Sequence, residues 1–193
     1  MEIVLHEPGI ALNTGNIGRT CAATLTGLHL IRPYGFLITE KEIKRAGMDY
    51  WEKIDLHQYI DYEDFLEKHP EICFQGEEIK ESAENASAPD ACGCRPKLWF
   101  ATTKARQSYT DVSFGPHDFI MLGNESRGIP EEILIQHPDA CIRIPMWGDI
   151  RSLNLANSAA IILYEALRQN GFEKLKSAGE LHRLHWNHQE NTD

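Results

Sequence analysis

Three short stretches of the sequence combine asparagine, glycine and arginine in patterns that suit the binding of a nucleotide or another polyanion. They are NTGNIGRTCAA from residue 13, GNESRGIP from residue 123 and PMWGDIRSLNLAN from residue 145. Asparagine and serine side chains bind hydroxyl groups, glycine lets a ligand approach the backbone, and arginine forms paired hydrogen bonds with phosphate. A helix cap or a tight turn explains each stretch taken alone, but neither feature requires arginine.

The elements that would position these stretches are short buried strands that alternate with helices. Five apolar runs predict strands at residues 3–5, 28–31, 98–101, 119–122 and 141–144. Helices are predicted by a proline-led start at residue 130 and by two apolar faces: Ile17, Cys21, Leu25 and Leu28, then Ala156, Ala159, Ala160, Leu163 and Leu167 before Gly171. This alternation predicts an α/β fold, a mostly parallel sheet flanked by helices. Ligands bind beyond the carboxyl ends of such strands, where all three stretches lie.

The composition favours one domain with an acidic insertion. At 193 residues, 42% hydrophobic and 25% charged, the chain suits a single core, expected over residues 1–172 and followed by a polar tail, 173–193. The net charge is −10, and residues 61–90 hold two lysines against ten acidic residues. Residues 75–96 are poor in apolar groups and are predicted to form a mobile surface insertion. The rest is near neutral, so local basic clusters can still bind a polyanion.

The sequence predicts a cytoplasmic protein without a membrane or metal partner. The N-terminus lacks the pattern of a signal peptide, and no apolar run approaches the roughly 20 residues that span a bilayer. The five cysteines are odd in number and scattered, which favours reduced thiols. Cys92 and Cys94 lack a second pair at zinc spacing, so no metal site is expected.

The three stretches also resemble a known family. In this order they are similar to the motifs of the SPOUT-superfamily RNA ribose 2′-O-methyltransferases: NTGNIGR, LGNESRGIP and IRIPMWGDIRSLNLANSAA. The similarity extends to GLHLIRPYGF, KEIKRAGMDYWEK, FATTK and YEALRQNGF, and it departs at the acidic stretch and after about Phe172. With no added RNA-binding domain, the compact chain resembles the bacterial enzymes that methylate the wobble ribose, position 34, of tRNA.

The resemblance implies a fold and a cofactor. The implied fold is the SPOUT fold, with a deep trefoil knot in its C-terminal part, where the last strand and helix pass through an earlier loop. The implied cofactor is S-adenosylmethionine, with contacts at Ala101, Thr102, Gly123, Ile144, Met146, Ser152 and Leu153. Glycine at position 123 is expected because the backbone would approach the adenosyl group closely.

The resemblance also assigns catalytic roles. It implies that Arg19 helps the ribose hydroxyl lose its proton, while Asn13, Glu125, Ser152 and Asn154 position Arg19 and the ribose. Arginine stays protonated in proteins, so we expect Arg19 to stabilise a developing alkoxide and to hold a phosphate, which leaves the proton acceptor unassigned.

The expected partners are tRNA and a second copy of the chain. Lys41, Lys44 and Arg45 would form one basic helix face, which fits either tRNA contact or a solvated surface, and Arg127 and Arg151 would contact phosphate or brace Glu125. The small-residue face at 156–160 would let a partner helix approach closely, unless it packs within the fold.

Two other interpretations stay open, and a third is disfavoured. The target could be another tRNA or rRNA nucleotide, or the chain could be a non-catalytic RNA-binding module on the same fold. An ordinary doubly wound nucleotide-binding enzyme is disfavoured, because GNIGRT matches neither common phosphate-loop pattern.

Overall fold

The computed structural model describes residues 1–36, 51–75, 95–183 and 186. Within these residues the chain forms a seven-stranded sheet with the order β3-β2-β1-β6-β4-β7-β5, in which every neighbouring pair is parallel. The strands are β1 (Glu2–His6), β2 (Gly27–Ile31), β3 (Leu56–Tyr59), β4 (Leu98–Ala101), β5 (Gln107–Ser108), β6 (Phe119–Leu122) and β7 (Cys141–Arg143). The predicted parallel α/β fold is therefore confirmed.

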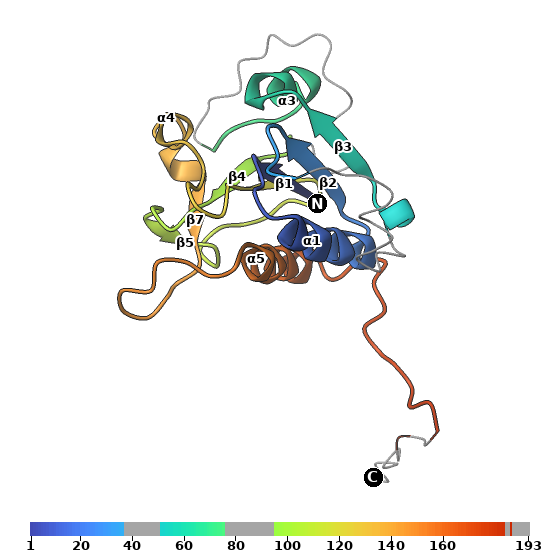
Figure 1. Cartoon of the computed structure of the whole chain (residues 1–193). Coiled ribbons are helices and arrows are strands. Elements are labelled where there is room, and N and C mark those ends of the chain that lie inside the picture. The colour runs from blue at the N-terminus through green and yellow to red at the C-terminus, as the bar shows by residue number, and fades with distance from the viewer. Residues whose placement is uncertain (37–50, 76–94, 184–185, 187–193) are drawn as a thin grey trace.

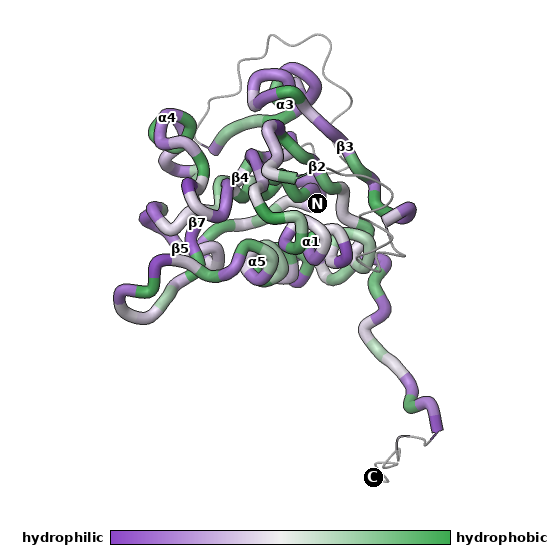
Figure 2. The backbone as a smooth tube through the Cα atoms, viewed as in Figure 1, coloured by the Kyte–Doolittle hydropathy of each residue, from purple (hydrophilic) through white to green (hydrophobic). Residues whose placement is uncertain are grey.

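Helices cover both faces of the sheet (Figure 1). The helices are α1 (Ala11–Thr24), α3 (Tyr62–Lys68), α4 (Glu131–Leu134) and α5 (Leu155–Gln169), and short 3-10 turns span Trp51–Lys53 and Pro138–Ala140. One core cluster joins α1 and α5 to alternate side chains of the strands, such as Ile3 and Leu5. A second cluster joins the other face, with Val4 and Met121, to α3 and α4. Figure 2 shows the central strands as mostly apolar and the outer turns of α3 as polar.

All five predicted strands are present, and two further strands were not predicted. β3 is an edge strand with only Tyr59 buried, and β5 has two residues, so neither carries a continuous apolar run. A short strand that packs at an edge leaves little signal in the sequence.

The predicted first helix is wrong at its end. Leu25 ends α1 with a left-handed φ of 55° and is 75% exposed, while Leu28 lies inside β2. Of the four residues of the predicted helix face, only Ile17 and Cys21 are buried helix residues. The chain enters β2 at Gly27, with only two residues between it and the end of α1, and β2 pairs in parallel with β1.

The predicted small-residue face of α5 serves the fold itself. Ala159 is 1% exposed and belongs to the core cluster shared with α1, against which Ala156 is partly buried. The α5 helix ends where predicted, since Gly171 adopts a left-handed φ of 70° directly beyond its last turn. Ala156 and Ala159 therefore pack within the chain, as the alternative stated above expected.

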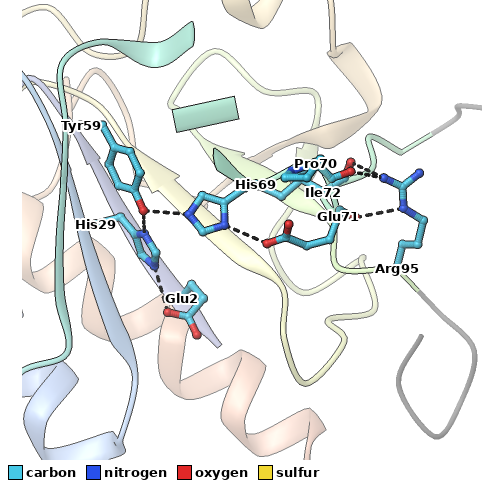
Figure 3. A network of polar contacts seen from close by, with 8 residues as sticks. All are labelled: Glu2, His29, Tyr59, His69, Pro70, Glu71, Ile72 and Arg95. Atoms are coloured by element: carbon cyan, nitrogen blue, oxygen red, sulfur yellow. Dashed lines mark hydrogen bonds and ion pairs between the residues drawn. The ribbon is translucent and has the colours of Figure 1, made fainter. Parts of the chain in front are cut away.

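A chain of polar groups crosses the α3 face of the sheet, and we call it the ring network (Figure 3). Glu2 Oε2 lies 3.1 Å from His29 Nε2, and the other ring nitrogen of His29 lies 2.7 Å from the Tyr59 hydroxyl. The same hydroxyl lies 2.7 Å from His69 Nε2, and His69 Nδ1 lies 2.8 Å from Glu71 Oε1. The Tyr59 hydroxyl has one proton, so it donates to one ring and accepts from the other.

Candidate functional site

A pocket of about 430 Å³ opens at the carboxyl ends of the central strands. Its walls come from the segments 101–104, 122–129 and 151–155, with further residues from β7 and α1. Such a volume suits a ligand of cofactor size. The pocket therefore stands where the topology of a parallel α/β sheet places ligand sites.

The structure brings most of the predicted site residues together around this pocket. All seven residues predicted to contact the cofactor line it: Ala101, Thr102, Gly123, Ile144, Met146, Ser152 and Leu153. Four of the five residues predicted to be catalytic line it as well: Asn13, Glu125, Ser152 and Asn154. Three segments that are far apart in the sequence thus meet at one place.

Glu125 fastens the loop before α1 to the loop after β6. Its carboxylate accepts hydrogen bonds from the Gly9 backbone N–H at 2.8 Å and the Ile10 N–H at 3.2 Å. It also accepts one from Asn13 Nδ2 at 2.9 Å. The side chain of Ile10, the N-cap of α1, makes no capping hydrogen bond, so the carboxylate supplies the acceptors and the negative charge that a helix start favours.

Asn154 connects this arrangement to α5. Its Nδ2 donates to Asn13 Oδ1 at 2.9 Å, while its Oδ1 accepts from the backbone N–H groups of Ala156 and Asn157. Asn154 is therefore the N-cap of α5, and its amide nitrogen donates the separate hydrogen bond to Asn13. We call Glu125, Asn13 and Asn154 the site network.

Gly123 is required because the backbone of Gly128 and Ile129 lies directly against it. A Cβ built there would stand 2.1 Å from the Gly128 carbonyl carbon and 2.2 Å from the Ile129 nitrogen. The protein's own backbone therefore constrains position 123, and the close approach of a cofactor there stays a prediction. Any side chain at 123 would push apart the loop that carries Glu125.

The two predicted arginines at the pocket rim are held by groups other than Glu125. Arg127 Nη2 pairs with Glu7 Oε2 at 2.8 Å, and Arg151 Nη2 donates to the Ser126 carbonyl at 3.0 Å. The suggestion that they brace Glu125 is wrong, because amide and backbone donors do so. Sequence reasoning missed Glu7, although its place directly after the first strand is where such a residue is expected.

Two further groups at the rim were not predicted. Asn124 Nδ2 donates to the Glu7 carbonyl at 2.7 Å, and its Oδ1 accepts from the N–H groups of Ser126 and Arg127, which shapes the turn. Lys104 lines the pocket and pairs with Glu131, where its hydrogen bond lowers the pKa of that carboxyl. The rim is therefore rich in cations that are already oriented.

Arg19 lies apart from the pocket of its own chain. It occupies an exposed position of α1 and is not among the residues that line the pocket. Six residues separate it from Asn13, about 9 Å along a helix axis. Arg19 therefore does not line the pocket of its own chain, and its role beside the ribose stays a prediction. Lys41, Lys44 and Arg45, the predicted basic face, lie outside the described residues.

The described part of the chain contains neither a candidate metal site nor a candidate membrane-spanning helix. No group of three histidine, cysteine or acidic side chains there could hold a metal ion. No described helix is both long and apolar enough to span a bilayer. Cys92 and Cys94 lie outside the described residues.

Comparison with known proteins decides the family. The sequence profile of the SpoU rRNA Methylase family matches residues 1–91 and 75–164. The chain belongs to this family. A tRNA (cytidine(34)-2′-O)-methyltransferase of Photorhabdus asymbiotica is 40% identical over 173 residues, which are 89% of this chain and 95% of that protein. The resemblance stated from the three sequence motifs is confirmed.

Solved structures agree with this SpoU methylase assignment. A structure described as giving insight into "the 2-OH methylation of C/U34 on tRNA" has a TM-score of 0.70 and 35% identity, covering 88% of this chain and 95% of its own. An AdoMet-bound rRNA methyltransferase from Sinorhizobium meliloti has a TM-score of 0.65 at 24% identity, covering 86% of this chain and 55% of its own, and shows the shared fold.

Proposed function

We propose that this chain transfers a methyl group from S-adenosylmethionine to the 2′-hydroxyl of a tRNA ribose, at the wobble nucleotide, position 34. The observation that carries the proposal is the convergence of the predicted contact residues on one pocket beside the site network. The names of the SpoU relatives support the substrate and the position.

The pocket fits the proposed cofactor. Leu122, Ile142 and Ile162 give it apolar walls for an adenine ring, and backbone groups near Ala101 can bind the ring edge. Bound S-adenosylmethionine supplies a methyl group already activated by its sulfonium charge. The protein then has to hold the ribose hydroxyl in line with that methyl group and stabilise the oxygen as it loses its proton.

The roles of the chain's own residues follow from their contacts. Glu125 and Asn13 are held rigidly, and Ser152 and Asn154 stand exposed at the pocket mouth, where a ribose would enter. We assign Arg127 and Arg151 to phosphates of the RNA, because their guanidinium groups are already oriented at the rim. Lys41, Lys44 and Arg45 stay candidates for contact with the tRNA backbone.

A homodimer is part of the proposal. Arg19 lies outside the pocket of its own chain, so it would serve the pocket of a partner copy. Exposed apolar side chains on α1 and α5 support a contact surface there: Leu12, Leu25, Ile161 and Tyr164. Sedimentation at micromolar concentration is expected to give twice the chain mass, and a monomer with full activity would contradict this part.

The C-terminal knot is proposed on the chain path. β5 follows β4 in the chain, yet it stands beyond β7 in the sheet, so residues 102–106 pass around the place that β7 occupies. The connection to β6 then runs along α5, where the Phe114 N–H donates to Gln169 Oε1 at 2.9 Å and Asn170 Nδ2 donates to the Phe114 carbonyl at 3.1 Å. This supports β7 and α5 passing through the loop 102–118.

The proposed domain is 1–172, with an acidic insertion at about 75–96 and a polar tail at 173–193. Phe172 and Leu175 pack against the core cluster that contains α5, so the first residues of the tail contact the domain. Residues 76–94 lie outside the described part of the chain.

Nucleoside mass spectrometry tests the function. The tRNA and rRNA of cells lacking the protein are compared with those of cells in which it has been restored. We expect one 2′-O-methylated nucleoside to vanish from the tRNA anticodon and to return. If a methylated nucleoside were lost from rRNA and not from tRNA, the substrate would be rRNA, as in the name of the family.

A further inference from the structure

The loop between β7 and α5 carries the most exposed large apolar side chain of the described residues. Trp147 is 92% exposed, and Ile150 on the same loop is 60% exposed. Figure 1 shows this loop projecting from the body of the molecule. Tryptophan is highly buried on average in proteins, so a tryptophan that contributes nothing to the core is unusual.

The position of Trp147 is set by groups that belong to the pocket. Met146, the residue before it, lines the pocket, and Arg151 closes the same loop and lines the pocket too. Arg151 is fixed to the Ser126 carbonyl at 3.0 Å. Gly148 turns the chain with a left-handed φ of 59°, which glycine adopts without strain. Trp147 therefore directly follows a residue of the pocket wall, and its side chain is open to solvent.

The surroundings of Trp147 indicate what covers it. The pocket rim carries Lys104, Arg127 and Arg151, and a protein interface is typically depleted of charge at its centre. An exposed aromatic ring on the same loop as an oriented arginine is instead the pattern of single-stranded nucleic-acid binding, where bases stack on rings and phosphates pair with cations.

We propose that Trp147 is a stacking platform for the base of a nucleotide next to the methylated one, and that it contributes to the choice of RNA. This inference rests on the proposed function, since it needs an RNA whose target ribose enters the pocket. A base that stacks on Trp147 while Arg151 holds a phosphate would fix the register of the strand. Trp147 is thus a specificity residue that does not touch the reacting atoms.

Binding of an anticodon stem-loop RNA, followed by fluorescence anisotropy, tests the platform. Trp147→Ala is expected to weaken binding about tenfold, within the range for loss of one stacked base, and Trp147→Phe is expected to stay within about threefold of wild type. The affinity for S-adenosylmethionine is expected to be unchanged in both. Ile60→Ala, which removes a side chain that is 71% exposed on the far edge of the sheet, is the matched control.

Abasic RNAs separate stacking from a general effect of the loop. Removal of one base beside the target nucleotide is expected to weaken wild-type binding about tenfold and Trp147→Ala binding hardly at all, because the two changes remove the same contact. Equal losses in both proteins would overturn the proposal. So would wild-type affinity in Trp147→Ala, or a variant that sediments as a monomer where the wild type is a dimer, since a second copy would then cover the ring.

Failure of the proposed function gives a different result. A wild-type chain that binds the RNA with this Trp147 dependence but transfers no methyl group would contradict the methyltransferase proposal and leave the platform standing. Methyl transfer by wild type, with unchanged RNA affinity in Trp147→Ala, would contradict the platform alone.

Discussion

The ring network and the site network are both polar chains that join neighbouring strands, but they differ in burial and chemistry. In the ring network, His29 is 2% exposed and Tyr59 is 5% exposed, and the contacts run from one carboxylate to another. In the site network, the side chain of Asn154 is exposed at the mouth of a pocket. The first network has buried rings at its centre and ends in two partly exposed carboxylates, whereas the second lies at the pocket.

The two networks also respond differently to protons. Burial lowers the pKa of His29, although its hydrogen bond to Glu2 acts in the opposite direction. Burial is the largest single influence on Glu2 and would raise its pKa, but the hydrogen bond from His29 and the charges of His29, the N-terminus and His57 together outweigh burial, so the net shift is downward. Two of the three members of the site network are amides, which do not titrate. The ring network thus depends on buried titratable rings, whereas the site network, to which we assign the positioning of the ribose, is held mainly by amides.

Breaking the site network is expected to have the largest effect. Glu125→Ala removes the acceptor of three donors, so the loops before α1 and after β6 lose their mutual position. A misplacement of about 1 Å costs on the order of a hundredfold in rate, and we expect methyl transfer to fall by about that factor. Single-turnover kinetics measures it.

The matched control is Glu132→Ala, an exposed glutamate in the first turn of α4. We expect that variant to keep wild-type rates. A Glu125→Ala protein that folds and transfers methyl at the wild-type rate would contradict the role given to the site network.

Breaking the ring network is expected to change stability and leave the rate alone. Tyr59→Phe removes the hydroxyl between two rings, and leaving buried polar groups unpaired costs about 1–3 kcal/mol of unfolding free energy. Denaturant unfolding measures this loss. A variant with wild-type stability but impaired methyl transfer would reverse the division between the two networks.

The ring network also predicts a dependence of stability on pH. The pKa of His29 is lowered in the folded chain. Its contribution to the unfolding free energy is therefore complete above the pKa of unfolded histidine, about 6.5, and declines as the pH falls below that value. The lowered pKa of Glu2 acts in the same direction, below about 4.5. We expect the unfolding free energy to fall from pH 7 to pH 5, with a smaller slope in His29→Gln. An unfolding free energy that rose over this range would contradict the assignment.

Replacing Asn154 sharpens the comparison, because its two tasks can be separated. Serine can cap α5 but cannot reach Asn13, whereas alanine can do neither. We expect Asn154→Ala to lose about 1 kcal/mol of unfolding free energy and Asn154→Ser to lose less. Both are expected to lose methyl transfer about tenfold, a loss of the size of one hydrogen bond. Full activity in the serine variant would show that capping alone matters.

Shortening the acidic stretch is expected to have the smallest effect. The Cys73 N–H donates to the Pro96 carbonyl at 2.9 Å, so the two ends of this stretch are already joined. Replacing residues 77–93 with a short glycine–serine link is expected to leave the affinity for S-adenosylmethionine unchanged, as measured by calorimetry, because loop length affects stability only weakly. Lost affinity would place this stretch within the folded core.

The short-range sequence pattern predicted the central strands and the segments that form the pocket walls. The apolar runs gave the central strands, and glycine- and asparagine-rich stretches after them marked the pocket walls. Leu25 was misassigned because the distance that α1 must cover before β2 depends on how the strands pair. The constraint on Gly123 comes from the backbone at Gly128, a contact made only after folding.

The ring network and the position of Arg19 left no signal that periodicity could detect. His29, Tyr59 and His69 are separated in sequence and meet because β2, β3 and the end of α3 are neighbours in space. The family resemblance implied a role for Arg19. Hydrophobic periodicity marks only residues that face the core, so it gives no information about an exposed helix residue such as Arg19. The proposed knot likewise concerns the path of the whole chain.

Transfer of a labelled methyl group to synthetic anticodon stem-loops tests the central claim most directly. One RNA carries a ribose at position 34, and its partner carries a 2′-deoxyribose there with the same base. We expect label in the first RNA alone, at the 2′-oxygen of nucleotide 34, while both RNAs bind. Equal label in the deoxy RNA would contradict the claim that this pocket methylates a ribose hydroxyl.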